Sequence, residues 1–195
     1  MGVRRRDVLK MVAASVVAGA TSALTACVHG AGANNHLPMA NGRETAMSSR
    51  PLMTVRIVAA PPQKLGAVPH GYRSIVPVTG GDFEGPRLRG KVLPGGGDWL
   101  LLRSDGVLEL DLRITLETDD HALIHMTFQG LRHGPPDAIA ALGRGEVVDP
   151  SSYYFRTLPR FETSTETYSF LNRLVTIGVG EARPDGAVHK IDEIL

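Results

Sequence analysis

The chain has few of the features that mark a disulfide scaffold, a nucleic-acid binder or a membrane-spanning protein. It has one cysteine in 195 residues, so no disulfide forms within the chain. Its net charge is +1, and residues 1–26 hold three arginines, one lysine and one aspartate, which leaves −2 for the rest. That balance offers no basic stripe for nucleic acid. Aromatic residues make up only 5%, whereas 22 glycines and 13 prolines indicate a β-rich domain with many turns.

The first 26 residues have the pattern of an export signal. Arg5-Arg6-Asp7-Val8-Leu9-Lys10 resembles the twin-arginine signal, and the apolar stretch 11–24 that follows is too short to span a bilayer. Leu24-Thr25-Ala26-Cys27 resembles the bacterial lipobox, which predicts a lipidated Cys27 and a membrane anchor without a transmembrane helix. The alternative is a soluble periplasmic protein cleaved within residues 20–23, with Cys27 incidental. Both alternatives predict an exported protein of the periplasm or cell envelope.

Composition divides the remainder into a tether and one folded domain. Residues 27–51 are rich in Gly, Ala, Asn, Ser and Met without periodicity, which predicts a flexible tether after the lipidated cysteine. Residues 52–195 alternate short apolar runs with turn signals, and a short helix is expected at residues 135–142. The predicted strands are 54–60, 72–79, 87–93, 99–103, 107–118, 122–132, 153–163, 173–181 and 186–194. Such a series is typical of an all-β antiparallel barrel or sandwich of eight to nine strands.

The clearest strand pattern is Leu-Glu-Leu-Asp-Leu-Arg-Ile-Thr-Leu-Glu at residues 108–117. Alternation with period two sorts the aliphatic residues onto one face and Glu109, Asp111 and Arg113 onto the other. If the charged face lines a closed barrel, it forms a site. If it faces water, it is an ordinary solvated strand face, which is common in antiparallel sheets.

The next strand can be aligned with this one. A three-residue loop at residues 119–121 opposes apolar residues throughout, whereas a two-residue loop would set Ile114 against His125. The first register therefore predicts the pairs Leu116–Ile124, Ile114–Met126 and Leu112–Phe128. It also places His125, Thr127 and Gln129 beside the charged face of strand 107–118.

Several motifs, taken in order, resemble a known family. They are Gly80-Gly81-Asp82-Phe83-Glu84-Gly85-Pro86, Leu93-Pro94-Gly95-Gly96-Gly97-Asp98-Trp99, Asp105-Gly106, Asp111-Leu112-Arg113, the block 153–163 and the block 168–173. Together they resemble the uncharacterised bacterial family called domain of unknown function 3237, over residues 52–195. The resemblance implies a small calycin-like antiparallel β-barrel that often self-associates and has no general activity established. The matching family positions are Asp98, Trp99, Asp111, Arg113, Arg156, Glu162, Tyr168 and Asn172.

Two positions depart from the family pattern. His121 stands where the family usually has glycine, which predicts a left-handed backbone conformation that histidine adopts at some cost. Phe170 stands where the family usually has Trp, so an indole contact is not expected there.

The residue types at these positions suggest acid–base chemistry. If Asp111 and Glu162 converge in a partly dry lumen, they can act as general base and acid, since burial and a neighbouring like charge separate carboxyl pKa values. Arg113 and Arg156 would clamp a carboxylate or a developing enolate. The other expected ligand-binding residues are Asp98, Trp99, His125, Tyr168 and Asn172. The alternative is that Asp111 with Arg113 and Arg156 with Glu162 are structural ion pairs.

Other chemistries have little support in the sequence. His125 and His133 would lie about 27 Å apart along one strand, so we expect no metal site, and we expect no cofactor. The predicted function is binding of a small, anionic or carbonyl-bearing molecule in the barrel lumen, with proton-transfer chemistry such as isomerisation, elimination or lactone opening. The alternatives are a non-catalytic binding protein and a structural envelope lipoprotein. The expected partners are a small-molecule ligand, a membrane through Cys27 and further copies of the chain, without nucleic acid.

Overall fold

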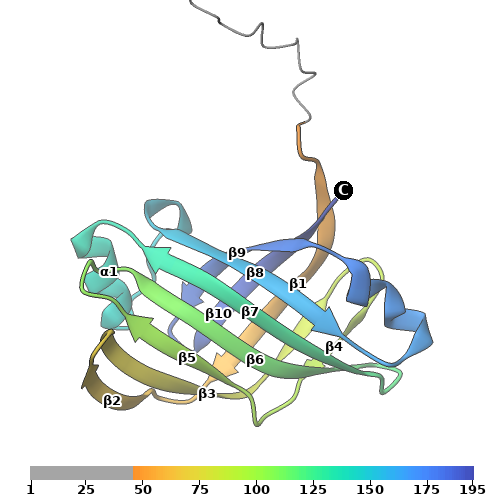
Figure 1. The fold of residues 1–195 in the computed structure, drawn as a ribbon, viewed down its shortest axis with the longest axis horizontal. Helices are drawn as coiled ribbons and strands as arrows, with labels where there is room; N and C mark the ends of the chain where they lie inside the picture. The colour runs from red at the N-terminus through yellow and green to blue at the C-terminus, as the bar shows by residue number, and fades with distance from the viewer. Residues whose placement is uncertain (1–45) are drawn as a thin grey trace, which may run out of the picture. The chain divides into compact units, whose positions relative to one another are not determined.

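The computed structural model describes residues 46–195 (Figure 1). The predicted signal peptide, Cys27 and most of the predicted tether lie outside these residues. The first strand begins at Ser49, three residues before the predicted start of the domain. The elements are β1 (Ser49–Ala59), β2 (Gln63–Val68), β3 (Gly71–Glu84), β4 (Arg89–Val92), β5 (Gly97–Leu102), β6 (Leu108–Thr118), β7 (Leu123–His133), α1 (Pro136–Gly143), η1 (Pro150–Ser152), β8 (Tyr154–Glu162), η2 (Glu166–Arg173), β9 (Thr176–Arg183) and β10 (Gly186–Ile194).

The strands form a closed antiparallel barrel with eight strand positions, one of the two architectures that the strand series predicts and the one that the family resemblance implies. Around the barrel the order is β1, β10, β9, β8, β7 and β6, then a position shared by two short strands, and then β3. The ring closes because β3 pairs with β1. The short strands β4 and β5 share the position between β3 and β6. Because every barrel position has two neighbours, the strands close around a lumen.

The β6–β7 hairpin has the predicted register. Leu116 pairs with Ile124, and the two predicted pairs beyond it, Ile114–Met126 and Leu112–Phe128, are also present. The loop residue His121 has a φ of 64°, the left-handed conformation expected where the family usually has glycine. The register therefore sends the aliphatic side chains of both strands to the same side of the sheet.

The two ends of the barrel are covered by different helices (Figure 1). At one end lies α1, which begins with Pro136 and packs Ile139 and Leu142 against the core. At the other end lies η2, which inserts Leu171, a side chain 1% exposed. The sequence predicts no helix at residues 166–173 and a strand from 173, whereas β9 begins at Thr176. Aromatic and polar residues alternate in this segment without a helical period, which explains the missed helix.

Strand β2 was not predicted from the sequence, and it pairs with β3 alone. Most of its residues are exposed, so no buried face imposes an alternating pattern. The register shifts between Lys64 and Gly66, and Gly66 has a φ of 96°. Such an irregularity is one way in which proteins protect an open sheet edge.

Candidate functional site in the barrel lumen

The lumen is filled on the side of η2 and hollow on the side of α1. Its hollow half is a cavity of about 130 Å³ bounded by β1, β3, β5, β6, β7, β8 and β10. Most of its lining is aliphatic or aromatic, including Leu110, Phe128 and Phe155. The ionisable residues among those that line it are Asp98, Arg132 and His189. A cavity of about 150 Å³ with apolar walls is large enough for benzene, so this one suits a small molecule.

Asp98 enters the lumen from β5 at a gap in the barrel wall. The ladder between β5 and β6 is interrupted at Trp99 and Leu100, opposite Leu110 and Asp111. The Asp111 N–H donates instead to Asp98 Oδ1, at 2.9 Å. The Trp99 carbonyl accepts a hydrogen bond from Arg73 Nη1, also at 2.9 Å. The carboxyl of Asp98 is therefore fixed by the backbone of the neighbouring strand.

Asp98 is only 9% exposed, and its protonation reflects that burial. Loss of hydration raises the pKa of Asp98 to about 7. The hydrogen bond from Asp111 N–H and the charge of Arg132 oppose this rise, while the charge of Asp111 adds to it. Near neutral pH this carboxyl consequently exists in both protonation states.

His189 enters the same cavity from β10, in contact with two aromatic rings. Its ring centroid lies 4.8 Å from that of Phe128 and 5.1 Å from that of Phe155, and the residue is 1% exposed. Burial lowers the pKa of His189 to about 4, so the imidazole is neutral at physiological pH. Its Nδ1 has no hydrogen-bond partner among the described residues.

Space for these rings comes from a glycine on β9. Gly180 pairs with His189, and a Cβ on Gly180 would lie 2.6 Å from Cγ of Phe155. The Phe155 ring therefore lies against the wall at this point and leaves the middle of the lumen open.

Arg132 is the cation of the cavity. It lies on the inner face of β7, in line with Phe128 and Gly130, and its guanidinium carbon is 5.7 Å from the centroid of Phe155. Burial lowers the pKa of Arg132. Within residues 46–195, no carboxylate lies within ion-pair distance of this guanidinium. An inward-pointing cation without a direct counter-ion is costly, which is typical of a site that receives an anionic group.

Arg132 and His189 were absent from the residues predicted from the sequence, although strand parity could have revealed both. In the predicted hairpin, position 132 shares a face with positions 124, 126 and 128, so it is inward whenever that aliphatic face is inward. His189 shares the face of Ile191 on the predicted strand 186–194. Asp98, one of the predicted ligand-binding residues, does line the lumen.

The predicted residues of the charged face lie on the outer surface of the barrel. Asp111 and Arg113 form an ion pair of 2.9 Å, with side chains 37% and 55% exposed. Arg113 lies over the ring of Trp99, 5.2 Å from its centroid. Of the two alternatives that the sequence left open for this face, the structure has the solvated one, because the aliphatic face of β6, with Leu112 and Ile114, occupies the interior.

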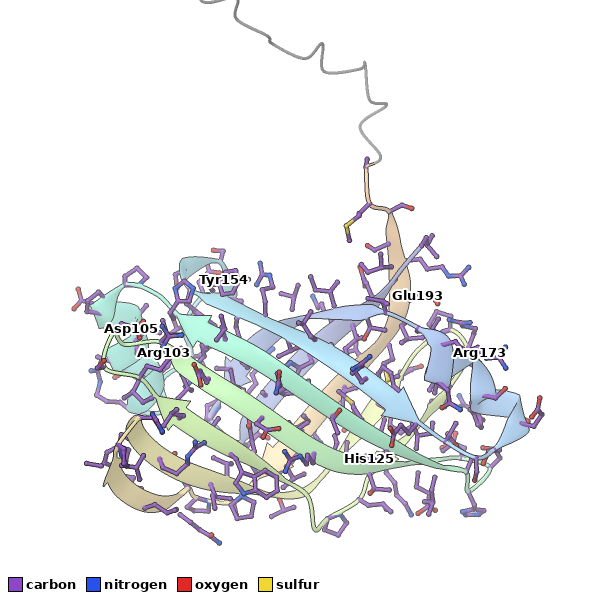
Figure 2. All side chains as sticks on the ribbon, viewed as in Figure 1. Arg103, Asp105, His125, Tyr154, Arg173 and Glu193 are labelled. Carbon is purple, nitrogen blue, oxygen red and sulfur yellow. The ribbon has the colours of Figure 1, made fainter. Side chains whose placement is uncertain are left out.

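The proposed acid–base pair of Asp111 and Glu162 does not come together. Glu162 is 83% exposed and lies 3.5 Å from Nδ1 of His125, which it faces across the β7–β8 ladder. Asp111 faces Gln129, four residues further along β7, which corresponds to about 13 Å. His125 and Tyr154 mark the two ends of this wall in Figure 2.

The remaining predicted residues have structural contacts outside the lumen. Arg156 donates to the Phe155 carbonyl at 2.9 Å and lies over the ring of Tyr154. The Tyr168 hydroxyl donates to Oδ1 of Asp120 at 2.9 Å. Asn172 binds both the N–H and the carbonyl of Thr163, each at 2.9 Å, and so joins η2 to the end of β8.

The lumen thus combines a fixed carboxyl that titrates near neutrality, a cation and a free imidazole nitrogen in an apolar enclosure. Such a set can bind a small molecule, move a proton and stabilise a negatively charged oxygen. No group of three His, Cys, Asp or Glu residues in the part of the chain described by the structure is arranged to hold a metal ion. The same part has no helix with the length and apolar character needed to cross a membrane.

Comparison with known proteins identifies relatives of this barrel. The model of a family described as "Protein of unknown function (DUF3237)" matches residues 47–194. A UPF0311 protein of Rhodopseudomonas palustris is 37% identical over 130 residues, 67% of this chain and 85% of the relative. A crystal structure of a conserved protein of unknown function from the same organism has a TM-score of 0.75 at 33% identity, over 76% of this chain and 98% of that one.

Two further solved structures have the same architecture. A beta-barrel like protein of Acinetobacter baumannii is 37% identical, with a TM-score of 0.68 over 76% of this chain and 96% of that chain. A structure described only as an enzyme from Penicillium herquei is 20% identical, with a TM-score of 0.60 over 78% of this chain and 98% of that chain. The second likeness concerns the fold alone.

Proposed function

The chain belongs to the DUF3237 family of proteins of unknown function. We propose that its lumen binds a small molecule on which Asp98 acts as a general acid or base. Asp98 takes the part that the sequence analysis gave to Asp111 and Glu162. The barrel of the Penicillium enzyme supports the proposal only at the level of the fold, because one fold can carry many activities.

One observation carries the proposal: the buried carboxyl of Asp98 has a pKa of about 7 and lines a small cavity. A general acid or base works best when its pKa lies near the working pH, because both protonation states are then available. Perturbed carboxyls in clefts are typical of functional sites. The hydrogen bond from Asp111 N–H holds the carboxyl in one position, which a proton-transfer group requires.

The neighbouring groups have complementary roles in this proposal. Asp98 in its ionised form removes a proton from the carbon next to a carbonyl group, and the resulting enolate oxygen is stabilised by Arg132. The protonated Asp98 then returns the proton at another position, which is an isomerisation, or protonates a leaving group, which is an elimination or lactone opening. Neutral His189 supplies a hydrogen bond that orients the bound molecule.

Hydrogen–deuterium exchange tests this chemistry without knowledge of the natural substrate. We expect the full chain in D2O to accelerate deuterium incorporation next to the carbonyl of some member of a panel of small ketones, lactones and aldehydes, followed by proton NMR. Asp98→Asn should reduce that rate at least 100-fold, in line with the usual contribution of a general base. Glu162→Gln is the matched control, since it changes an exposed carboxylate on the outer face of the barrel.

The outcomes separate two functions. Exchange that is lost in Asp98→Asn and kept in Glu162→Gln supports an enzyme. Exchange unchanged in Asp98→Asn contradicts the proposed role. Probes that bind in the lumen but never exchange make the protein a non-catalytic binding module, which is the second function that the sequence left open.

We also propose that the protein is exported and anchored to a membrane through Cys27. The support is the twin-arginine-like and lipobox-like motifs of the sequence. Mass spectrometry of the protein extracted from bacterial membranes should find an acylated N-terminal Cys27, and Cys27→Ala should move the protein to the soluble fraction. A membrane-extracted chain without acyl groups on Cys27 would be inconsistent with the anchor.

A further inference from the structure

The ligand class of the lumen follows from the way its two charges are held. Asp98 is fixed to β6 through Asp111 N–H rather than paired with Arg132, and the two act on each other only through space. Arg132 packs on the Phe155 ring and has no carboxylate within ion-pair distance in residues 46–195. A guanidinium presents parallel N–H donors that match the two oxygens of a carboxylate.

The rest of the cavity is suited to an apolar body. Phe128, Phe155 and the aliphatic residues of β3 and β6 line it. The neutral ring of His189 contacts the same Phe155 ring as Arg132 and has a buried Nδ1 without a partner. In the tautomer that carries its proton on Nδ1, this nitrogen can donate to an oxygen of the ligand. A buried polar atom left without a partner is destabilising, so a ligand that supplies the partner is favoured.

We infer that the lumen takes a small apolar monocarboxylate, whose carboxylate pairs with Arg132 and whose binding draws one proton from solvent onto Asp98. This inference rests on the proposed function, because it assigns a ligand class to the same site. The proton balances the charge: Asp98⁻ and Arg132⁺ in the empty lumen become neutral Asp98, Arg132⁺ and the bound carboxylate⁻. The ligand therefore enters the lumen together with a proton, in effect as the neutral acid.

The charges around Asp98 support this coupling. Arg132 acts on it from β7 and Asp111 from β6, His189 lines the same cavity from β10, and the residue paired with Asp98 on β3 is the uncharged Val76. A carboxylate bound to Arg132 offsets the positive charge that lowers the pKa of Asp98 and adds a like charge nearby. Both changes raise the pKa of Asp98 above its value of about 7 in the empty lumen.

The sign of the pH dependence follows from linkage. Between the pKa of Asp98 in the empty lumen and its higher value in the complex, binding takes up one proton. The association constant should then fall by close to tenfold for each unit of rising pH above about 7. Below that range Asp98 is protonated in both states, and the constant should be nearly independent of pH.

Calorimetric titration of the full chain with benzoate tests the inference, with benzamide as the uncharged probe of the same shape. At pH 8, titrations in two buffers of different ionisation enthalpy should show uptake of about one proton per benzoate and none for benzamide. Asp98→Asn should bind benzoate without proton uptake. Arg132→Met should lower the affinity for benzoate at least tenfold and leave the affinity for benzamide unchanged. Arg113→Met, which removes an arginine from the outer face, is the matched control and should change neither affinity.

The results distinguish this inference from the proposed function. If benzamide binds, a substitution that fills the lumen abolishes this binding, and benzoate does not bind, the carboxylate inference is overturned while the lumen remains a binding site. Benzoate binding without proton uptake in the wild-type chain overturns the coupling, even if Arg132→Met fails to fold. If no probe binds, including the ketones and lactones of the exchange panel, both the inference and the proposed lumen site fail.

Discussion

The inner and outer faces of the β5–β7 wall carry the same kinds of charged residue in different surroundings. On the outer face, Asp111 and Arg113 pair with each other and remain partly exposed to water. On the inner face, Asp98 and Arg132 are enclosed by apolar side chains and have no direct ion pair between them. Burial changes the chemistry of the inner pair: it moves the pKa of Asp98 to about 7 and lowers that of Arg132.

The difference shows why the density of charged residues is a poor guide to a site. The outer face carries more of the charged residues of these strands. Exposed ion pairs such as Asp111 with Arg113 contribute little to the free energy of folding, because water and salt screen them. The inner face has few charges, but each has lost most of its hydration. The variants below test whether the two faces differ as much as their surroundings imply.

The largest effect is expected for the aliphatic residues that fill the lumen. Leu116→Ala removes a side chain that is 0% exposed, and it should lower the free energy of unfolding by about 2–5 kcal/mol. Leu158→Ala on the outer face of β8, where the side chain is 62% exposed, should change it by less than about 0.5 kcal/mol. Urea unfolding followed by circular dichroism measures both. A loss above 2 kcal/mol for Leu158→Ala would mean that the outer face is covered in solution.

The next effect is a gain of stability that depends on pH. The pKa of Asp98 is higher in the folded protein than the ordinary value of 3.8 for an aspartate, so ionisation of Asp98 opposes folding. Its penalty is absent below about pH 4, grows between pH 4 and 7 and is complete above about pH 7. Asp98→Asn should therefore be more stable than the wild type by about 2–4 kcal/mol at pH 8, and the difference should shrink towards pH 4.

Thermal unfolding from pH 4 to 9 measures this difference. Glu162→Gln, which changes an exposed carboxylate on the outer face of β8, is again the matched control and should show no growing difference over the same range. A gap between Asp98→Asn and wild type that stays constant with pH would show that Asp98 is not the buried titrating carboxyl.

The strand series and the family resemblance together predicted the barrel. Strand parity predicted the register of its central hairpin, but not which of the two faces of β6 was inside. The alternation at residues 108–117 places Asp111 and Arg113 opposite Leu112 and Ile114, and it is equally compatible with either orientation. The interior was decided by packing, because only the aliphatic face can fill the space between the barrel walls and η2. Arg132 and His189 would have followed had that parity been extended to the ends of both strands.

Other parts of the site depend on contacts between distant residues, which one sequence does not display. The pKa of Asp98 depends on burial by strands far along the chain, and the gap between β5 and β6 leaves no local pattern at Trp99 and Leu100. Strand β2 also leaves no local pattern, because its residues are exposed on both sides and therefore do not alternate. The family resemblance was more informative about the loop, since the glycine usual at position 121 predicted the left-handed conformation that His121 has.

A smaller effect is expected at the glycine that shapes the lumen. A methyl group on Gly180 would meet the Phe155 ring at 2.6–2.7 Å, so Gly180→Ala should push this ring into the cavity and cost about 1–3 kcal/mol. It should also weaken binding of any lumen probe. Gly143→Ala, which adds a methyl group in open space at the end of α1, is the control and should not destabilise the chain. Unchanged stability and probe affinity in Gly180→Ala would contradict the role of this position in shaping the cavity.

The smallest effect concerns the turn that assigns residues to the two faces. His121 has a φ of 64° and a side chain that is 84% exposed, and its Nδ1 lies 2.9 Å from Glu117. His121→Gly relieves the left-handed strain but increases the freedom of the unfolded chain and loses the hydrogen bond to Glu117, so we expect a gain below about 1 kcal/mol. His121→Ala keeps the strain without the polar contact and should be the least stable of the three. If the alanine variant were instead more stable than the wild type, the loop would have adopted another conformation. NMR contacts between the amides of Ile114 and Met126 would then show whether the register had changed and the inner and outer faces had exchanged.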